Sequence, residues 1–312
     1  MNIDSFNPVL TEGSFPALCD LSLTAGIDDV ERFFRDKFAP VNVTDLYLNS
    51  YKKHTPSEVH SLLLALSQVC QRLTRLHIVL LEKEFNLSEL PSDEQISFDT
   101  LQPVFSFSHL TWFEILHKYP LKITLNDVEE LSSRLPLLES LGLNPEPLYT
   151  RKCTLDLRAL LPFAKHCHKL KVLGIFINAT GIETPPAHSL IKPFHALQTL
   201  DVGTSRLENP CSVSAFLSLL LPPWCTLQNG ITWQYCGTEE HRQLDPNVAA
   251  EILDQMNRWA DISVLLPSLV EDRRDDRQRT NTLQEEVEEL RIQNRLLMDK
   301  AGIRADDSCT IA

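Results

Sequence analysis

Apolar residues recur along this chain in one short pattern, L-x-x-L-x-L, which occurs eight times when apolar substitutes are allowed. The copies begin at Leu18, Val43, Leu73, Leu110, Leu138, Leu170, Leu197 and Leu227, and the last copy is degraded. Their mean spacing is about 30 residues, and a period of that size is the signature of a repeat array. The pattern therefore predicts one structural unit repeated along most of the chain.

Each copy predicts a strand followed by a helix. The closing L-x-L alternates with a period of two, which suits a strand with one buried face. Apolar spacings of three and four predict helices over 27–38, 56–70, 126–135, 155–167 and 212–221, with Asn126 or Asp127 as one cap. This unit indicates an α/β leucine-rich-repeat solenoid with a curved parallel sheet and outer helices. The alternative is an ordinary α/β domain with leucine-rich strands.

The chain divides into four predicted parts. Residues 1–240 form the solenoid, and residues 241–270 form a helical cap, because the end of a repeat stack must be closed. Pro267 is expected to interrupt this helix. Residues 271–301 are predicted to be a charged linker and a short coiled coil, and residues 302–312 a flexible tail.

The coiled-coil prediction rests on steps of four and three between Leu283, Val287, Leu290, Asn294 and Leu297. The leucines fall at heptad position d, and the valine and the asparagine fall at position a. A buried Asn at one a position fixes the register of a parallel dimer, and Glu286 can pair with Arg291 of the other chain. The pattern predicts a homodimer, and the alternative is a single solvated helix.

The residues between the inward positions of each copy are expected to share the concave face of the sheet and to bind a partner protein. These residues are Asp20, Ser22, Asp45, Tyr47, Arg75, His77, Trp112, Glu114, Thr199 and Asp201. Trp112 and Tyr47 are the candidate anchors, because aromatic side chains contribute much of the energy of interfaces. The alternatives are that they decorate a solvated sheet, or that Trp112 packs under an insertion near residues 84–100.

Composition narrows the function. The 312 residues carry a net charge of −13, which argues against nucleic acid or an anionic membrane as a partner. No apolar run has the length of a membrane helix, and the N-terminal residues do not resemble a signal peptide. We therefore expect a cytoplasmic or nuclear protein.

Candidate chemistry is sparse. The eight cysteines are not expected to form a disulfide framework, since Cys70 and Cys167 stand at buried positions of the repeat. His166 and His168 flank Cys167 without further ligands at metal-site spacing, so no metal is expected. No phosphate-binding, dinucleotide-binding or hydrolase motif occurs. The sequence favours a recognition protein that is not an enzyme and has no cofactor.

The repeats resemble those of F-box leucine-rich-repeat proteins, especially the divergent fungal set. The resemblance covers about residues 15–235, and segments such as 167–175 (CHKLKVLGI) and 194–202 (FHALQTLDV) carry it. It implies that the repeats capture a substrate, with an F-box linking the chain to a cullin ubiquitin ligase. No L-P-x-E opening of an F-box is recognisable here. The resemblance therefore implies a substrate receptor without a recognisable F-box.

The last four residues, which begin with Cys309, match the prenylation signal C-a-a-X, with Ala at the final position suggesting farnesyl. A chance match is the alternative. Prenylation of Cys309 would make the chain a membrane-recruited signalling adaptor, which is the second functional hypothesis. One lipid gives only marginal membrane binding, so dimerisation would be needed for firm attachment.

Overall fold

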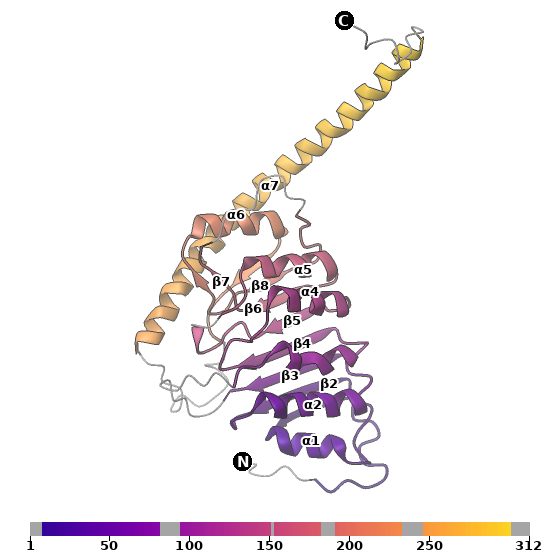
Figure 1. Cartoon of the computed structure of the whole chain (residues 1–312), viewed down its shortest axis with the longest axis vertical. Helices are drawn as coiled ribbons and strands as arrows, with labels where there is room; N and C mark the ends of the chain where they lie inside the picture. Colours follow the sequence, from indigo (N-terminus) through magenta and orange to yellow (C-terminus); the bar gives the residue numbers. More distant parts are fainter. Residues whose placement is uncertain (1–7, 82–93, 151–152, 182–190, 233–245, 301–312) are drawn as a thin grey trace, which may run out of the picture.

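The computed structural model describes residues 8–81, 94–150, 153–181, 191–232 and 246–300. The chain forms one eight-stranded parallel sheet that alternates with helices, followed by a long C-terminal helix (Figure 1). The strands, in their spatial order, are β1 Asp20–Thr24, β2 Asp45–Ser50, β3 Arg75–Leu80, β4 Trp112–His117, β5 Ser140–Leu143, β6 Val172–Ile175, β8 Thr199–Asp201 and β10 Thr226–Gln228. Each strand pairs in parallel with the next, as the repeat pattern predicts.

The register keeps all eight copies of the pattern in phase. The second apolar position of each copy pairs with its equivalent in the next strand, as Leu76 does with Phe113 and Leu173 with Leu200. These side chains point into one continuous core between the sheet and the helices. Leu76, Leu141, Leu173 and Leu200 are fully buried, which confirms the predicted inward face.

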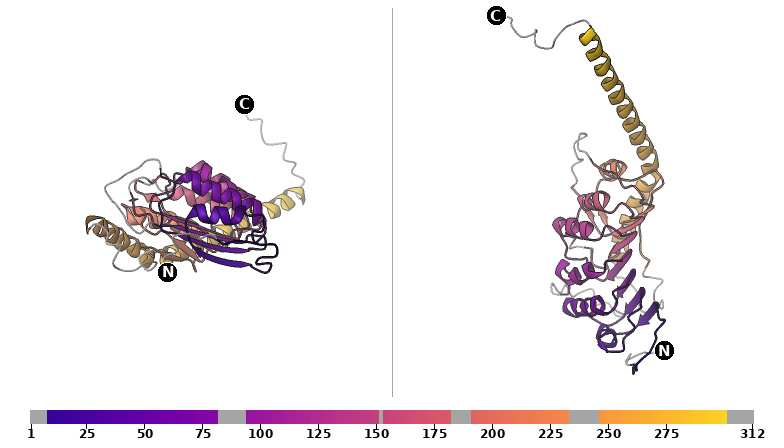
Figure 2. Two further views of the ribbon diagram at one scale, coloured as in Figure 1. Left: turned by 90° about the horizontal axis from the view of Figure 1, so that it is seen from below. Right: turned by 90° about the vertical axis from the view of Figure 1, so that its right-hand side faces the viewer.

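The helices of the repeats stack along one side of the sheet (Figure 2). They are α1 Ile27–Arg35, α2 Pro56–Val69, α3 Phe98–Leu101, α4 Leu125–Arg134, α5 Leu160–His166 and α6 Pro210–Leu220, with 3-10 turns η1 Gln102–Ser106 and η3 Leu157–Ala159. A small second sheet pairs β7 Asn178–Ala179 with β9 Arg206–Leu207.

Local sequence explains where the helices begin. Thr55 caps α2, where its hydroxyl accepts from the Glu58 amide while the Glu58 carboxylate accepts from the Thr55 amide. Thr124 and Asp127 make the same reciprocal bonds at α4. The predicted cap at Asn126 or Asp127 was therefore wrong by two or three residues, because the threonine offers the reciprocal arrangement.

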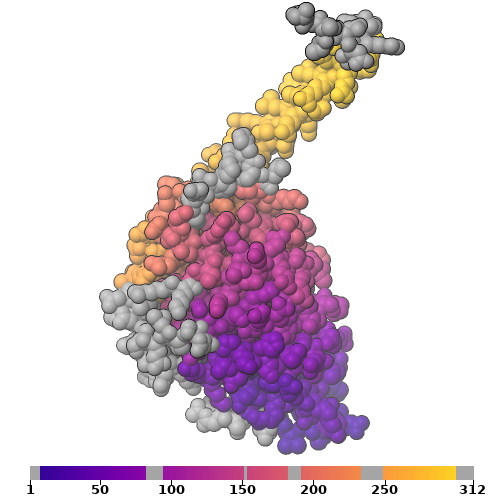
Figure 3. All heavy atoms as spheres, viewed as in Figure 1, coloured from indigo at the N-terminus to yellow at the C-terminus, as the bar shows by residue number. Residues whose placement is uncertain are grey.

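The C-terminal helix α7 spans Pro246–Lys300 without a break. The expected interruption at Pro267 and the expected linker after it were wrong. A proline inside a helix costs about 3 kcal/mol. Leu266 and Val270 are buried on either side of Pro267, and the apolar contacts on both sides offset that cost. Residues 271–299 of α7 are exposed, and this part of the helix projects from the body (Figure 3).

The first half of α7 closes the apolar core at the end of the stack. It packs against α6 and β9, and its fully buried Trp259 donates a hydrogen bond of 2.8 Å from Nε1 to the Ser205 carbonyl. Gln255 accepts from the Leu207 amide at 2.7 Å. Through these contacts the first half of α7 covers one end of the core.

Candidate partner-binding face

The register of β1 to β4 brings most of the predicted binding residues together in two adjacent rows. The first row runs Asp20, Asp45, Arg75 and Trp112, and the second runs Ser22, Tyr47, His77 and Glu114. They alternate along each strand with inward apolar residues and are exposed or half-buried. We call these eight residues the sheet-face patch.

Three ring systems lie side by side in the patch. The ring centroids of Tyr47 and His77 are 6.1 Å apart, and those of His77 and Trp112 are 5.2 Å apart. The Arg75 guanidinium carbon lies 5.9 Å from the Trp112 ring, within the range of a cation–π contact. Tyr47 remains 36% exposed, and Trp112 is half-buried. The three rings thus form an accessible aromatic surface across β2, β3 and β4.

One ion pair and one hydrogen bond hold the charged side chains of the patch in place. Arg75 Nε lies 3.2 Å from Asp45 Oδ1, and His77 Nδ1 lies 2.8 Å from Glu114 Oε2. Such exposed pairs contribute about 0–1 kcal/mol to stability, so their main effect is on orientation. The patch holds three carboxylates, of Asp20, Asp45 and Glu114, against one guanidinium, and is therefore acidic when His77 is neutral.

Beyond β4, glycines occupy the second row of outward positions. Gly142 pairs with Glu114, and a Cβ at Gly142 would lie only 2.8 Å from Glu114 Cγ. At Gly174, the next position, a Cβ would lie 3.2 Å from Pro145 Cγ. Because neither position has a side chain, the Glu114 side chain lies directly on the sheet at Gly142, and Pro145 lies directly on it at Gly174.

Residues 144–149, which we call the covering segment, follow β5 and lie across the carboxyl ends of strands on both sides of it. The Pro145 carbonyl accepts from the Thr204 amide at 3.1 Å, and the Lys118 carbonyl accepts from the Leu148 amide at 2.9 Å. Lys118 follows β4 and Thr204 follows β8, so the segment connects the carboxyl ends of these strands.

Two residues with left-handed backbone make this crossing fit. Asn144 has φ +48°, and its side chain accepts from the His117 amide and donates to the Tyr119 carbonyl. Gly203 has φ +47°, and a Cβ there would lie 2.0 Å from the Pro145 carbonyl oxygen. Only glycine therefore fits at position 203 while the covering segment stays in place.

The covering segment forms a second, smaller core on this side of the sheet. Leu148 is buried against Val79 and Leu81, and Leu116, Tyr149 and Ile231 pack around them. The Glu146 carboxylate also accepts a hydrogen bond of 2.9 Å from the Thr232 hydroxyl. The repeat pattern did not predict this cover, although the glycines at outward positions 142 and 174 were a readable signal for it.

The covering segment lies over Gly174 and so separates Asp201 of β8 from the sheet-face patch. The prediction that all ten residues share one open surface was therefore wrong for Asp201, whereas Thr199 lies in the first row of outward positions, two strands beyond β5. Asp201 is half-buried and accepts a 2.9 Å hydrogen bond from the Gly203 amide. Burial, together with the charges of Glu146 and Glu114, raises the pKa of Asp201 to about 7, against the lowering effect of the hydrogen bond from the Gly203 amide. Asp201 thus belongs to the covered half of the face.

The described residues offer little for catalysis or metal binding. Within them, no group of three or more His, Cys, Asp or Glu side chains could hold a metal ion. Burial raises the pKa of the Cys70 and Cys167 thiols to about 12, which suppresses the reactive thiolate. Ser50 Oγ lies 2.6 Å from His54 Nε2, but both side chains are buried, so the bond supports the turn after β2.

The predicted coiled-coil residues Leu283, Val287, Leu290, Asn294 and Leu297 all lie on the projecting half of α7 and are exposed. Cys309, the predicted prenylation site, lies outside the described residues. In the part of the chain that the structure describes, no helix combines the length and apolar character needed to span a membrane. Compared with known proteins, the chain matches no family model and no curated protein.

Proposed function

We propose that this chain is a leucine-rich-repeat solenoid that binds a basic segment of a partner protein on the sheet-face patch and has no catalytic role. The observation that carries the proposal is the difference within one sheet face. Residues 144–149 of the chain itself cover the face at Gly174 and at the carboxyl ends of β3, β4 and β8, whereas the earlier outward positions of β1 to β4 present three rings and several charged groups to solvent.

The solenoid interpretation is supported by the equivalence of the repeated units. Eight strands pair in order and in phase, and the helices between them lie on one side. A single unit cannot bury its apolar side alone, so the units share a core with their neighbours, as repeat proteins do. The open sheet face is the surface that such proteins use for binding.

Charge supports a basic partner. The patch has three carboxylates against one guanidinium, and the whole chain carries −13, so a cationic segment is attracted from a distance. The Trp112 ring already accepts the Arg75 guanidinium at 5.9 Å, and Tyr47 offers a second ring. Lysine or arginine side chains of a partner fit such rings beside carboxylates.

The size of the patch supports an extended segment. Neighbouring strands are about 4.8 Å apart, so β1 to β4 span roughly 14 Å. An extended chain covers about 3.4 Å per residue, so four to five residues would cross the patch. The resemblance to F-box leucine-rich-repeat proteins adds a further proposal, that the bound segment belongs to a substrate of a ubiquitin ligase.

A peptide selection tests the proposed function. Random peptides of about twelve residues, displayed on phage, would be selected on the folded full-length protein. We expect enrichment of lysine and arginine, and loss of binding with Trp112→Ala. Trp224→Ala is the matched control, since Trp224 is an exposed tryptophan outside the patch. Selected peptides that bind Trp112→Ala as well as the unaltered protein would contradict the proposal.

A further inference from the structure

The projecting half of α7 carries an apolar stripe with no cover. Leu283, Leu290 and Leu297 are 60%, 56% and 64% exposed, and Val287 is 46% exposed. Together with Asn294 they occupy the a and d positions of a heptad pattern, and we call these five residues the α7 seam. Such a stripe on a charged helix is costly to leave in water.

The seam belongs to a helix that the body already anchors. Trp259, Ile262, Leu266 and Val270 are buried, and Arg277 Nη2 donates to the Leu219 carbonyl at 2.7 Å. An isolated helix of three heptads is marginal, because starting a helix is unfavourable. In α7 the packed first half already forms the helix. The seam residues therefore extend an existing helix and do not have to start one.

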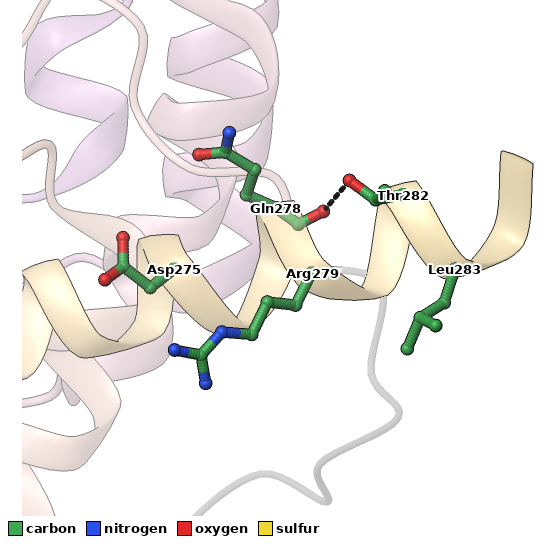
Figure 4. A pocket seen from close by; sticks show the side chains of 5 residues that line it. All are labelled: Asp275, Gln278, Arg279, Thr282 and Leu283. Atoms are coloured by element: carbon green, nitrogen blue, oxygen red, sulfur yellow. Dashed lines mark hydrogen bonds between the residues drawn. The ribbon is translucent and has the colours of Figure 1, made fainter. Parts of the chain in front are cut away.

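Hollows on the surface of the helix include residues of the seam. One is lined by Asp275, Gln278, Arg279, Thr282 and Leu283, with Arg279 and Leu283 projecting on the same side (Figure 4). The next is lined by Thr280, Leu283, Gln284, Val287, Glu288 and Arg291. Its first four residues hold positions a, d, e and a, which form the hole that receives a d-position leucine in a parallel coiled coil.

We propose that a second copy of this chain occupies the α7 seam and forms a parallel, two-stranded coiled coil. Valine at a with leucine at d favours two strands. In the parallel register Asn294 meets Asn294 of the partner, whereas an antiparallel pairing would place it against a leucine. Glu286 at g then faces Arg291 at e of the partner, so the charges are complementary on both flanks.

The dimer goes beyond the proposed function and does not depend on it. A parallel arrangement places both repeat bodies at the same end of the coiled coil. The particle then presents two sheet-face patches to one partner, and two linked sites bind a repeated partner more tightly than one site does.

Sedimentation of the full-length protein tests the dimer. At about 10 μM we expect a particle of twice the 35.5 kDa chain mass, because association depends on concentration. Leu290→Lys should weaken association by roughly 100-fold. Ile292→Lys is the matched control, since Ile292 is equally exposed at 56% but lies at position f, off the seam. A monomer at this concentration, or a dimer that Leu290→Lys leaves intact, would overturn the proposal.

Charge reversal tests the parallel orientation. Glu286→Lys and Arg291→Glu should each weaken the dimer, and the double variant should restore it, because the two residues face each other only in the parallel register. Circular dichroism should show the same melting of the body in all variants. A dimer without this rescue would overturn the parallel arrangement, and a trimer would overturn the two-stranded one.

Discussion

Two parts of one sheet face differ in whether the chain itself covers them. In the sheet-face patch the outward positions hold Tyr47, His77 and Trp112 and stay accessible, whereas Gly142 and Gly174 of β5 and β6 and the last outward residues of β3 and β4, Val79 and Leu116, lie under other parts of the chain. The inward positions hardly differ between the halves, since leucine, isoleucine and phenylalanine form one core throughout. The outward residues therefore determine whether the face packs on its own chain or stays open.

The covered half shows what kind of contact the open half can make. Residues 144–149 combine backbone hydrogen bonds at the strand ends with a small apolar cluster around Leu148. The open half offers aromatic rings and carboxylates in place of glycines, so the partner that we propose would contribute side chains rather than backbone. Four substitutions test this difference between the covered and the open part of the face. They are given from the largest expected effect on stability to the smallest.

Leu173→Ala should weaken both halves together. Leu173 is fully buried in the shared core, so emptying its site should lower the free energy of unfolding by about 2–5 kcal/mol. Chemical denaturation measures this loss. If it stayed below about 1 kcal/mol, the inward side chains would not form one tightly packed core.

Gly203→Ala should damage the covered half selectively. The new Cβ would meet the Pro145 carbonyl at a left-handed backbone position, and we expect a loss of about 2–4 kcal/mol. Gly13→Ala is the control, since Gly13 also has positive φ but no atom within 4 Å of a Cβ. Hydrogen exchange should become faster in β5 and β6 and stay unchanged in β1 and β2. Equal effects at the two glycines would contradict the fit of the covering segment.

Asp201→Asn should make the covered half less sensitive to pH. The pKa of Asp201 is raised to about 7, so the folded state holds its proton more tightly than the unfolded chain does. The stabilisation of the folded state by this bound proton is fully present below the pKa of Asp201 in the unfolded chain, and it is lost as pH rises towards 7. The variant keeps an acceptor for the Gly203 amide and should be more stable than the unaltered protein at pH 8, by about 1–2 kcal/mol. Equal stability of the two proteins at pH 8 would show that burial does not perturb this carboxyl group.

Trp112→Ala should have the smallest effect on folding. The ring is half-buried and contacts mainly His77 and Arg75, so the free energy of unfolding should fall by about 1 kcal/mol or less. Thermal unfolding monitored by circular dichroism checks this. A loss as large as that of Leu173→Ala would mean that Trp112 is a core residue rather than a binding residue.

The sequence pattern predicted the strands and helices well because they follow from the local, periodic spacing of apolar residues. The eight strands of the large sheet and five of the helices follow from apolar spacing, and the register of β1 to β4 follows from the phase of the repeats. The sheet-face patch was predictable for the same reason, since outward positions alternate with inward ones.

The remaining features depend on contacts between residues far apart in the chain. The covering segment needs Pro145 to meet Gly203, and the small sheet needs β7 to meet β9, neither of which has a periodic signal. The unbroken α7 depends on the burial of Leu266 and Val270 around Pro267. Local propensity predicts a break there, and tertiary packing overrides it.

Binding of a selected basic peptide to matched tryptophan variants tests the central claim most directly. Calorimetry would compare the affinities of the unaltered protein, Trp112→Ala and Trp224→Ala for the same peptide. Loss of a central aromatic anchor should weaken binding by about 30-fold or more with Trp112→Ala, and Trp224→Ala should leave it unchanged. Equal affinities of Trp112→Ala and the unaltered protein, or a larger loss with Trp224→Ala, would contradict the assignment of partner binding to the sheet-face patch.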